Sequence, residues 1–117
     1  MMKREDVFNY VKDTYKTEPE YLWEKLPNYA VLRHCTNDKW YAIIMDVDKS
    51  KLGLSGSGKE DIIDIKLNPE KVEEFLEFDD FLPAYHMNKK NWVSVRLAKI
   101  DKNTLTKLID RSFELTK

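Results

Sequence analysis

Apolar residues that recur at three- and four-residue steps predict three amphipathic helices in this chain. The helices are expected over residues 3–16, 69–78 and 101–113. Pro19 and the residue before it disfavour further helix after the first of them. Asn68 is a good N-cap and Pro69 suits the first helical position of the second, while Asp101 or Asn103 can cap the third.

Runs of β-branched and aromatic residues predict the strands of a sheet. These strands are expected at residues 29–34, 40–47, 63–67 and 93–97. The first two flank residues 36–38, whose short polar side chains suit a tight turn, so we expect a β-hairpin there. Because the second run has no polar alternation, its strand should be covered on both faces, with Trp40 in the middle of the sheet core.

The order of these elements is helix, several strands, helix, strand and helix. Strands that cluster between helices and are joined partly by tight turns favour an antiparallel arrangement. The sequence therefore predicts an α+β fold, an antiparallel β-sheet flanked by about three α-helices. At 117 residues, the chain 1–117 has the usual length of a single domain.

Residues 48–60 contain all three glycines of the chain, interleaved with serine and lysine. Gly53 to Lys59 match the start of the phosphate-loop pattern, but Glu60 stands where that pattern needs a hydroxyl for magnesium. A strand rather than a helix is also expected after the segment. We therefore expect a flexible hairpin tip that does not bind nucleoside triphosphates.

Composition excludes several classes of function. The formal net charge is −1 and the isoelectric point is near 6.1, so the chain lacks the overall positive field of most non-specific nucleic-acid or membrane-surface binders. A single cysteine and two histidines without ligand spacing predict no disulfide, no metal site and no cofactor. The N-terminus lacks an apolar signal core, and no run is long enough to span a bilayer. We expect a cytoplasmic protein.

His34 and Cys35 are the one adjacent pair that suggests a nucleophile and its base. Neighbouring residues of a strand point to opposite faces of the sheet, so these two cannot share a proton. We therefore expect no catalytic activity.

The small net charge conceals two opposed segments. Residues 60–80 hold two basic and nine acidic groups, for a charge of −7. Residues 81–117 hold eight basic and three acidic groups, for +5. The basic segment also contains Tyr85 and Trp92, and cations interleaved with aromatic rings can hold phosphates and stack bases.

Several stretches resemble the MmcQ/YjbR family. Residues 82–95, LPAYHMNKKNWVSV, are similar to the family pattern P-x-x-H-[ML]-N-K-x-[HN]-W followed by a strand. Residues 108–115 resemble the family's final helix, in which Asp-x-Ser-[YF] recurs. Residues 27–34, 39–42 and 64–69 also match a longer branch of the family.

The resemblance implies a fold like that of CyaY, the bacterial frataxin homologue, in which helices flank an antiparallel sheet. It also implies DNA binding without catalysis, with hairpins acting as wings. This chain departs from that expectation in its negative net charge, and it has Asn91 where histidine is common in the family.

If the late strand begins at Trp92, then Trp92, Ser94 and Arg96 lie on one face, opposite the core. Loop residues just before the strand would join that face. The candidate nucleic-acid-binding residues are therefore His86, Asn88, Lys89, Lys90, Trp92 and Arg96. The alternative is structural: His86 and Asn88 would hydrogen-bond the backbone of their loop, and Trp92 would pack under the last helix.

Two functional hypotheses follow. In the first, a basic C-terminal surface and the 48–60 hairpin wing bind DNA or RNA weakly and without regard to sequence. In the second, the chain is a protein-interaction or regulatory module whose acidic and basic segments dock a partner protein or a second copy. Neither involves a membrane.

Overall fold

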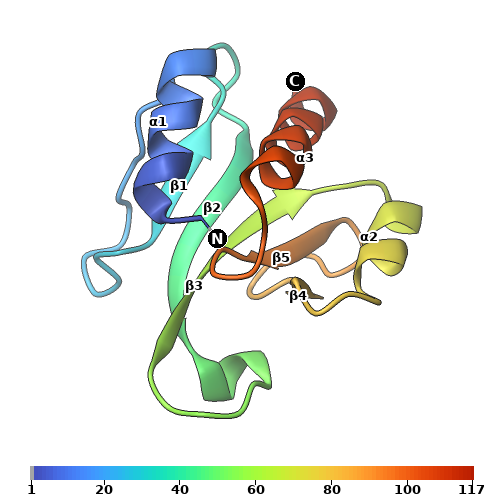
Figure 1. The fold of residues 1–117 in the computed structure, drawn as a ribbon. Coiled ribbons are helices and arrows are strands. Elements are labelled where there is room, and N and C mark those ends of the chain that lie inside the picture. The colour runs from blue at the N-terminus through green and yellow to red at the C-terminus, as the bar shows by residue number, and fades with distance from the viewer. Residues whose placement is uncertain (1) are drawn as a thin grey trace.

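The computed structural model describes residues 2–117, and in these residues a five-stranded antiparallel β-sheet packs against three α-helices (Figure 1). The α+β fold predicted from the sequence is therefore confirmed. In chain order the elements are α1 (Arg4–Tyr15), β1 (Ala30–Arg33), β2 (Trp40–Asp48), the 3₁₀-helix η1 (Lys49–Leu52), β3 (Lys59–Lys66), α2 (Pro69–Phe75), β4 (Phe81–Pro83), β5 (Trp92–Arg96) and α3 (Lys102–Thr116). No helix within residues 2–117 is long and apolar enough to cross a membrane.

The strands lie side by side in the order β1-β2-β3-β5-β4, and every neighbouring pair is antiparallel. β2 and β3 form a long hairpin, paired from Ala42–Ile65 to Asp48–Lys59. β5 then pairs with β3, and the short β4 closes that edge. The interior position of β2 explains why its run of apolar residues lacks alternation.

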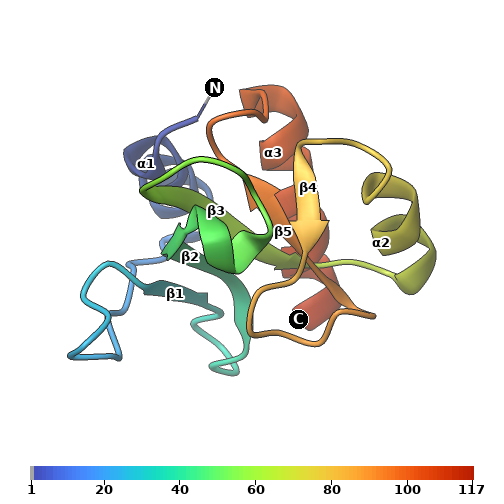
Figure 2. The ribbon, with the colours of Figure 1, turned by 90° about the horizontal axis from the view of Figure 1, so that it is seen from below.

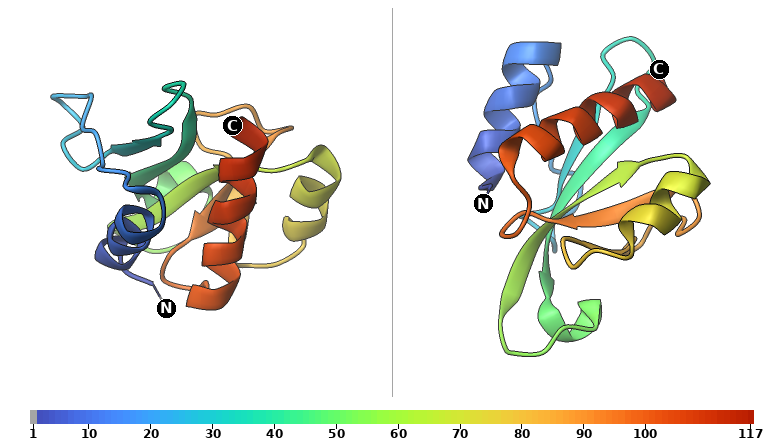
Figure 3. Two further views of the ribbon diagram at one scale, coloured as in Figure 1. Left: turned by 90° about the horizontal axis from the view of Figure 1, so that it is seen from above. Right: turned by 45° about the vertical axis from the view of Figure 1, so that its right-hand side comes forward.

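The two faces of the sheet are covered differently. Figure 2 and the left view of Figure 3 show α1 and α3 on one face, here called the helix-covered face, and two long loops on the other, the loop-covered face. These loops are residues 16–29 and 84–91. β3 illustrates the division, because Ile63 and Ile65 join the core under the helices while Ile62 joins a second core under the loops.

Most element boundaries agree with the sequence prediction. Asp101 is the N-cap of α3, and its carboxylate accepts a hydrogen bond from the Thr104 amide at 3.0 Å. α1 ends earlier than Pro19 requires, because Lys16 adopts the left-handed conformation at φ 59°. The strand β4 was not predicted, since three residues are too few to show a period.

The prediction for Trp40 is wrong. It lies at the start of β2 and is half-buried, whereas we had expected it in the middle of the sheet core. The register between β1 and β2 shifts after Leu32, so that Tyr41 is an extra residue in β2. This bulge turns Tyr41 toward the helices and Trp40 toward the loops.

Residues 48–59 form the tip of the β2–β3 hairpin, which extends beyond the sheet at the bottom of Figure 1. η1 ends at Gly53, whose φ of 73° favours glycine at that position. Lys59 then begins β3 directly, with no helix to receive a phosphate. The prediction that a strand follows this segment is confirmed.

Candidate functional site

The loop-covered face contains a pocket lined mostly by aromatic and apolar side chains. Its volume is about 270 Å³. The lining residues are Trp23, Leu26, Tyr29, Trp40, Ile43, Met45, Tyr85, His86 and Met87. β2 supplies the floor, loop 16–29 one wall and loop 84–91 the other. We call this the aromatic pocket.

Trp23 organises the first wall. Its ring meets Tyr29 edge to face, with centroids 6.0 Å apart, and meets Trp40 in the same way at 5.9 Å. Such perpendicular contacts are a favoured arrangement of aromatic rings. On the second wall, His86 lies against Tyr85 with ring centroids 4.1 Å apart. The rings therefore hold one another in place around the pocket.

A buried carboxyl group anchors the second wall. Ser94 donates a hydrogen bond to Asp64 and accepts one from the Tyr85 amide at 3.0 Å. Asp64 is fully buried, and its second oxygen, Oδ2, has no hydrogen-bond partner within residues 2–117. Burial raises the pKa of Asp64 to about 7, although the Ser94 hydrogen bond and the charge of Lys89 oppose this shift. The chain Asp64–Ser94–Tyr85 thus ties loop 84–91 to the sheet.

The predicted row of Trp92, Ser94 and Arg96 does lie on one face, since Val93 and Val95 occupy the opposite, helix-covered core. The expectation that this row is open to a ligand is wrong. Trp92 is only 9% exposed and Ser94 is fully buried. The physical reason is loop 84–91, which follows β4 back across this face and hydrogen-bonds Ser94 through Tyr85.

Arg96 is also unavailable for phosphate. Its guanidinium makes two hydrogen bonds to the Glu60 carboxylate, 2.6 Å from Nε and 3.0 Å from the terminal NH2 nitrogen. Glu60 is itself buried, and the pairing raises the pKa of Arg96. Glu60 is distant from Arg96 in sequence, and the antiparallel pairing of β3 with β5 brings them together.

The other four candidate residues lie together on loop 84–91. Asn88 has a structural role, because its Oδ1 accepts a hydrogen bond from the Lys90 amide at 2.9 Å. His86 is exposed and lines the aromatic pocket, with a φ of 62°. Lys89 and Lys90 are exposed, and within residues 2–117 no carboxylate forms an ion pair with either.

The remaining C-terminal cations do not form one surface. Lys107 and Arg111 line a groove between α3 and α2, together with Lys71 and an apolar floor that includes Phe75. Lys99 lies at the opposite end of β5 from Lys89, just before α3 begins. The +5 segment is therefore dispersed around the molecule by the fold.

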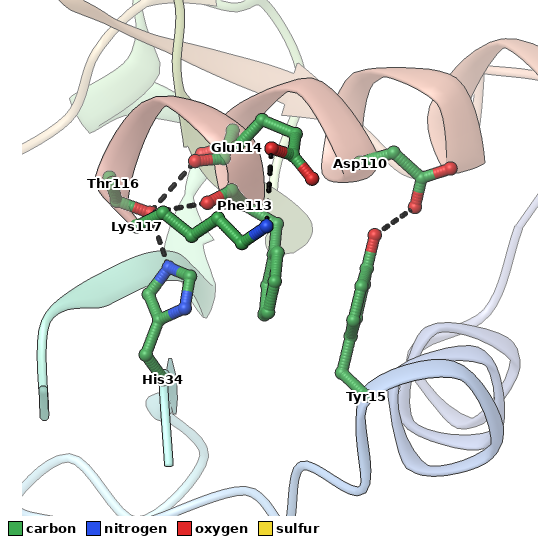
Figure 4. Close-up of polar contacts among 8 residues, drawn as sticks. Tyr15, His34, Asp110, Phe113, Glu114, Thr116 and Lys117 are labelled. Atoms are coloured by element: carbon green, nitrogen blue, oxygen red, sulfur yellow. Dashed lines mark hydrogen bonds and ion pairs between the residues drawn. The ribbon is translucent and has the colours of Figure 1, made fainter. Parts of the chain in front are cut away.

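His34 and Cys35 lie just beyond β1, which ends at Arg33, and not within a strand as expected. His34 is buried, with Nε2 2.7 Å from the Thr116 hydroxyl (Figure 4). Cys35 is exposed. Burial lowers the pKa of His34. The two side chains share no contact through which a proton could pass.

The segment similar to the family's final helix has a structural role in this molecule. Asp110 accepts hydrogen bonds from Tyr10 and from Tyr15, the second of which Figure 4 shows. Both bonds join α1 to α3. Ser112 donates to the Tyr41 carbonyl at 2.6 Å and accepts from the Lys66 amide at 2.9 Å, so it links α3 to β2 and β3. Phe113 stacks on Tyr15 with centroids 3.8 Å apart.

Sequence reasoning missed the residues that build most of the pocket. The sequence patterns assign no functional role to Trp23, Tyr29 or Asp64. One feature of the sequence does point to Asp64, which lies between Ile63 and Ile65 in a predicted strand. If that strand is central and covered on both faces, its aspartate must be buried. Within residues 2–117, no group of three or more histidine, cysteine or acidic side chains is placed to hold a metal ion.

Comparison with known proteins gives matches that cover nearly the whole chain. The uncharacterized protein YyaQ of Bacillus subtilis (strain 168) is 48% identical over 118 residues, covering all of both chains. A crystal structure of a Pseudomonas syringae protein shares 42% identity, covers 99% of this chain and 100% of its own, and superposes with a TM-score of 0.96. A Deinococcus radiodurans protein at 20% identity covers 98% of this chain and 78% of its own with a TM-score of 0.74, which shows a shared fold.

The family model that matches is YjbR, over residues 12–115. This match and the close relatives confirm the resemblance found in the sequence. The chain therefore belongs to the YjbR family.

Proposed function

We propose that this chain binds nucleic acid weakly and without sequence preference through its loop-covered face. The observation that carries the proposal is the position of Lys89 and Lys90, two exposed lysines without ion-pair partners on the loop that forms one wall of the aromatic pocket. Phosphate contacts from lysine and stacking on aromatic rings are the two components of sequence-tolerant binding to single strands.

Other exposed lysines lie close in sequence to residues of the same face. Lys39 directly precedes Trp40, and Lys25 follows Trp23 by two positions. Both are exposed. The tip of the β2–β3 hairpin adds Lys51, which is also exposed, so the tip can serve as a wing that meets the backbone of a longer strand. These lysines take the place of Arg96 as candidate phosphate contacts, because Arg96 is bound to Glu60.

The expected affinity is low. Each phosphate neutralised on a single strand contributes about −0.7 to the slope of log K against log salt, so three contacts give a slope of about −2. The acidic residues of α2 repel the ligand at long range. We expect dissociation constants no tighter than the non-specific range of about 10⁻⁴ to 10⁻⁶ M.

Fluorescence anisotropy with labelled single- and double-stranded oligonucleotides at low and moderate salt tests the proposal. The double variant Lys89→Glu/Lys90→Glu should lose salt-dependent binding. Lys99→Glu/Lys102→Glu changes the charge of the chain by the same amount at exposed positions beyond the other end of β5, and it should retain most of the binding. Equal losses in both variants would mean that only net charge matters, and absence of binding in the wild type would refute the proposal.

One observation favours the second candidate function, a protein-interaction module. Exposed Leu76 and Phe78 follow α2, and exposed carboxylates surround them in the sequence. These acidic residues are Glu73, Glu74, Glu77 and Asp79. An apolar patch ringed by acidic groups fits a basic amphipathic segment of another protein.

Calorimetric titration with a synthetic basic amphipathic peptide tests this second function. Phe78→Ser should weaken binding of the peptide. Tyr21→Ser removes a ring of similar exposure in loop 16–29 and should not weaken it. Equal effects of the two variants, or no binding by the wild type, would count against an interaction site at α2.

A further inference from the structure

The aromatic pocket combines apolar walls with polar groups that have no partner in the chain. The hydroxyls of Tyr10, Tyr15 and Tyr41 each donate a hydrogen bond within the chain. Within residues 2–117, the hydroxyls of Tyr29 and Tyr85 make no such bond, and neither do the indole N–H groups of Trp23 and Trp40. The four residues that carry these groups all line the pocket.

These properties select a small, flat ligand with polar atoms at its rim. The volume of about 270 Å³ lies just below the range of about 300–1,000 Å³ that is typical of pockets for drug-sized molecules. Walls of mutually perpendicular rings leave faces and edges against which a planar ring can stack. Nucleobases have this shape, and every base offers a π-face and hydrogen-bonding edges.

Exposed lysines near the pocket favour a base that carries phosphate groups. Lys25, Lys39 and Lys89 each lie within two positions of a lining residue, are exposed, and form no ion pair within residues 2–117. They come from three different segments of the chain: loop 16–29, the turn between β1 and β2, and loop 84–91. Cations around an aromatic pocket are complementary to a base that is flanked by phosphates on both sides.

We infer that the aromatic pocket receives one unpaired nucleobase of a single-stranded nucleic acid, with lysines at its rim contacting the flanking phosphates. The inference rests on the proposed nucleic-acid binding and adds to it a preference for single strands. A duplex keeps its bases stacked and paired, so a base must first be unstacked to enter such a pocket.

The wall formed by loop 84–91 is preorganised for this role. The Tyr85 amide is held by Ser94, which is in turn held by the fully buried Asp64. His86, the next residue, keeps its ring against Tyr85 in a left-handed backbone conformation that is uncommon outside glycine. Little of the binding free energy is then spent on ordering this wall.

A comparison of two oligonucleotides separates base binding from phosphate binding. Oligothymidylate and an abasic strand of the same length carry the same phosphates, but only the first has bases. We expect oligothymidylate to bind at least about fivefold more tightly, the lower end of what one stacked base contributes. Because two of the three tryptophans line the pocket, oligothymidylate should also quench the intrinsic fluorescence, and the abasic strand should not.

Equal affinity for the two strands, with normal salt dependence, would overturn the base pocket and leave the proposed function standing. Absence of binding to either strand at low salt would overturn both. A matched duplex that quenches the tryptophans as strongly as oligothymidylate would also contradict the inference, because it would show that unpaired bases are not required.

Variants locate the effect. Trp40→Leu should reduce the preference for oligothymidylate over the abasic strand to less than twofold, whereas Phe78→Leu, at an exposed ring outside the pocket, should leave it unchanged. His86→Gly is the second variant, because glycine accepts a φ of 62° and the fold should survive the change. If both folded variants keep the full preference, the pocket is not the base site.

Discussion

At the scale of single residues, Asp64 is the most unusual side chain of the molecule. It is fully buried in the middle of the sheet, paired across the strands with Ile43 and Ser94. Its raised pKa means that the folded protein holds the proton more tightly than the unfolded chain, in which an aspartate titrates near 3.9. The neutral carboxyl is the form that the dry interior favours.

This difference predicts a pH dependence of stability. Below the unfolded pKa both states are protonated, and the full stability is present. As the pH rises from about 4 to about 7, the unfolded state loses its proton first, so the free energy of unfolding falls, and above the folded pKa of about 7 it stays low. Asp64→Asn should remove this dependence. Urea unfolding at pH 5 and pH 8 measures it, and a wild-type curve parallel to that of the variant would contradict the assignment.

The ion pair with Glu60 makes Arg96 a structural residue rather than a free cation. Its side chain is 16% exposed and that of Glu60 7%, so the pair is largely withdrawn from water. Arg96→Met should destabilise the protein by about 2 kcal/mol, because it leaves a buried carboxylate without its charged hydrogen bonds. Lys90→Met should change the stability by less than about 0.5 kcal/mol, since Lys90 is exposed and unpaired. Similar denaturation midpoints for the two variants would refute this distinction.

At the scale of secondary-structure elements, the bulge in β2 decides which residues meet a ligand. If β2 had no bulge and Tyr41 took part in regular alternation, Trp40 would lie on the same face as Ala42 and Ile44, under the helices. With the bulge, Trp40 joins the aromatic pocket and Tyr41 donates to the Thr17 hydroxyl at 2.7 Å. The bulge thus adds Trp40 to the floor of the pocket.

The bulge also lowers the expected cost of removing Trp40. Ile44→Ala, at a fully buried position of the same strand, should cost about 2–5 kcal/mol. Trp40→Ala should cost less than Ile44→Ala, although tryptophan is the larger side chain, because the half-buried ring leaves a partly solvated space rather than a cavity. Guanidinium unfolding of both variants tests the order, and a larger loss for Trp40→Ala would place that ring in the core.

At the scale of the whole molecule, the fold gives the two faces of the sheet different tasks. α1 and α3 seal one face and are joined by the hydrogen bonds of Tyr10 and Tyr15 to Asp110. The other face is covered by loops, which leave the aromatic pocket between them. The helix α2, whose sequence contains three glutamates, lies on the other side of the molecule from loop 16–29, as the left view of Figure 3 shows.

This division predicts the footprint of a bound strand. Hydrogen exchange of backbone amides should slow in loops 16–29 and 84–91 when oligothymidylate is added. Amides of α1 and α3 should not change, because both helices cover the opposite face. Protection that is strongest in α2 and α3 would instead place the ligand in the groove between Lys71 and Arg111.

Local patterns were sufficient for much of the fold. The apolar stripes of α1 and α3, the Asn68-Pro69 start of α2 and the Thr36–Asp38 turn were all read from a few adjacent residues. They could be read because helix periodicity, capping and turn conformation depend on contacts within one or two turns of the chain. The family resemblance was equally local, since it rested on short stretches of consecutive residues.

The candidate site depended on contacts between residues that are distant in the chain. Glu60 and Arg96 are separated by 36 positions, and Asp64 and Ser94 by 30, yet the pairing of β3 with β5 makes them neighbours. Sequence alone determined which side chains share a face in β3 and β5, because alternation is a property of one strand and is unbroken there. The face of Trp40 in β2 depended on the bulge opposite β1. Only the tertiary structure decided which face a loop covers and which cation an acid neutralises, because burial and charge pairing arise between elements.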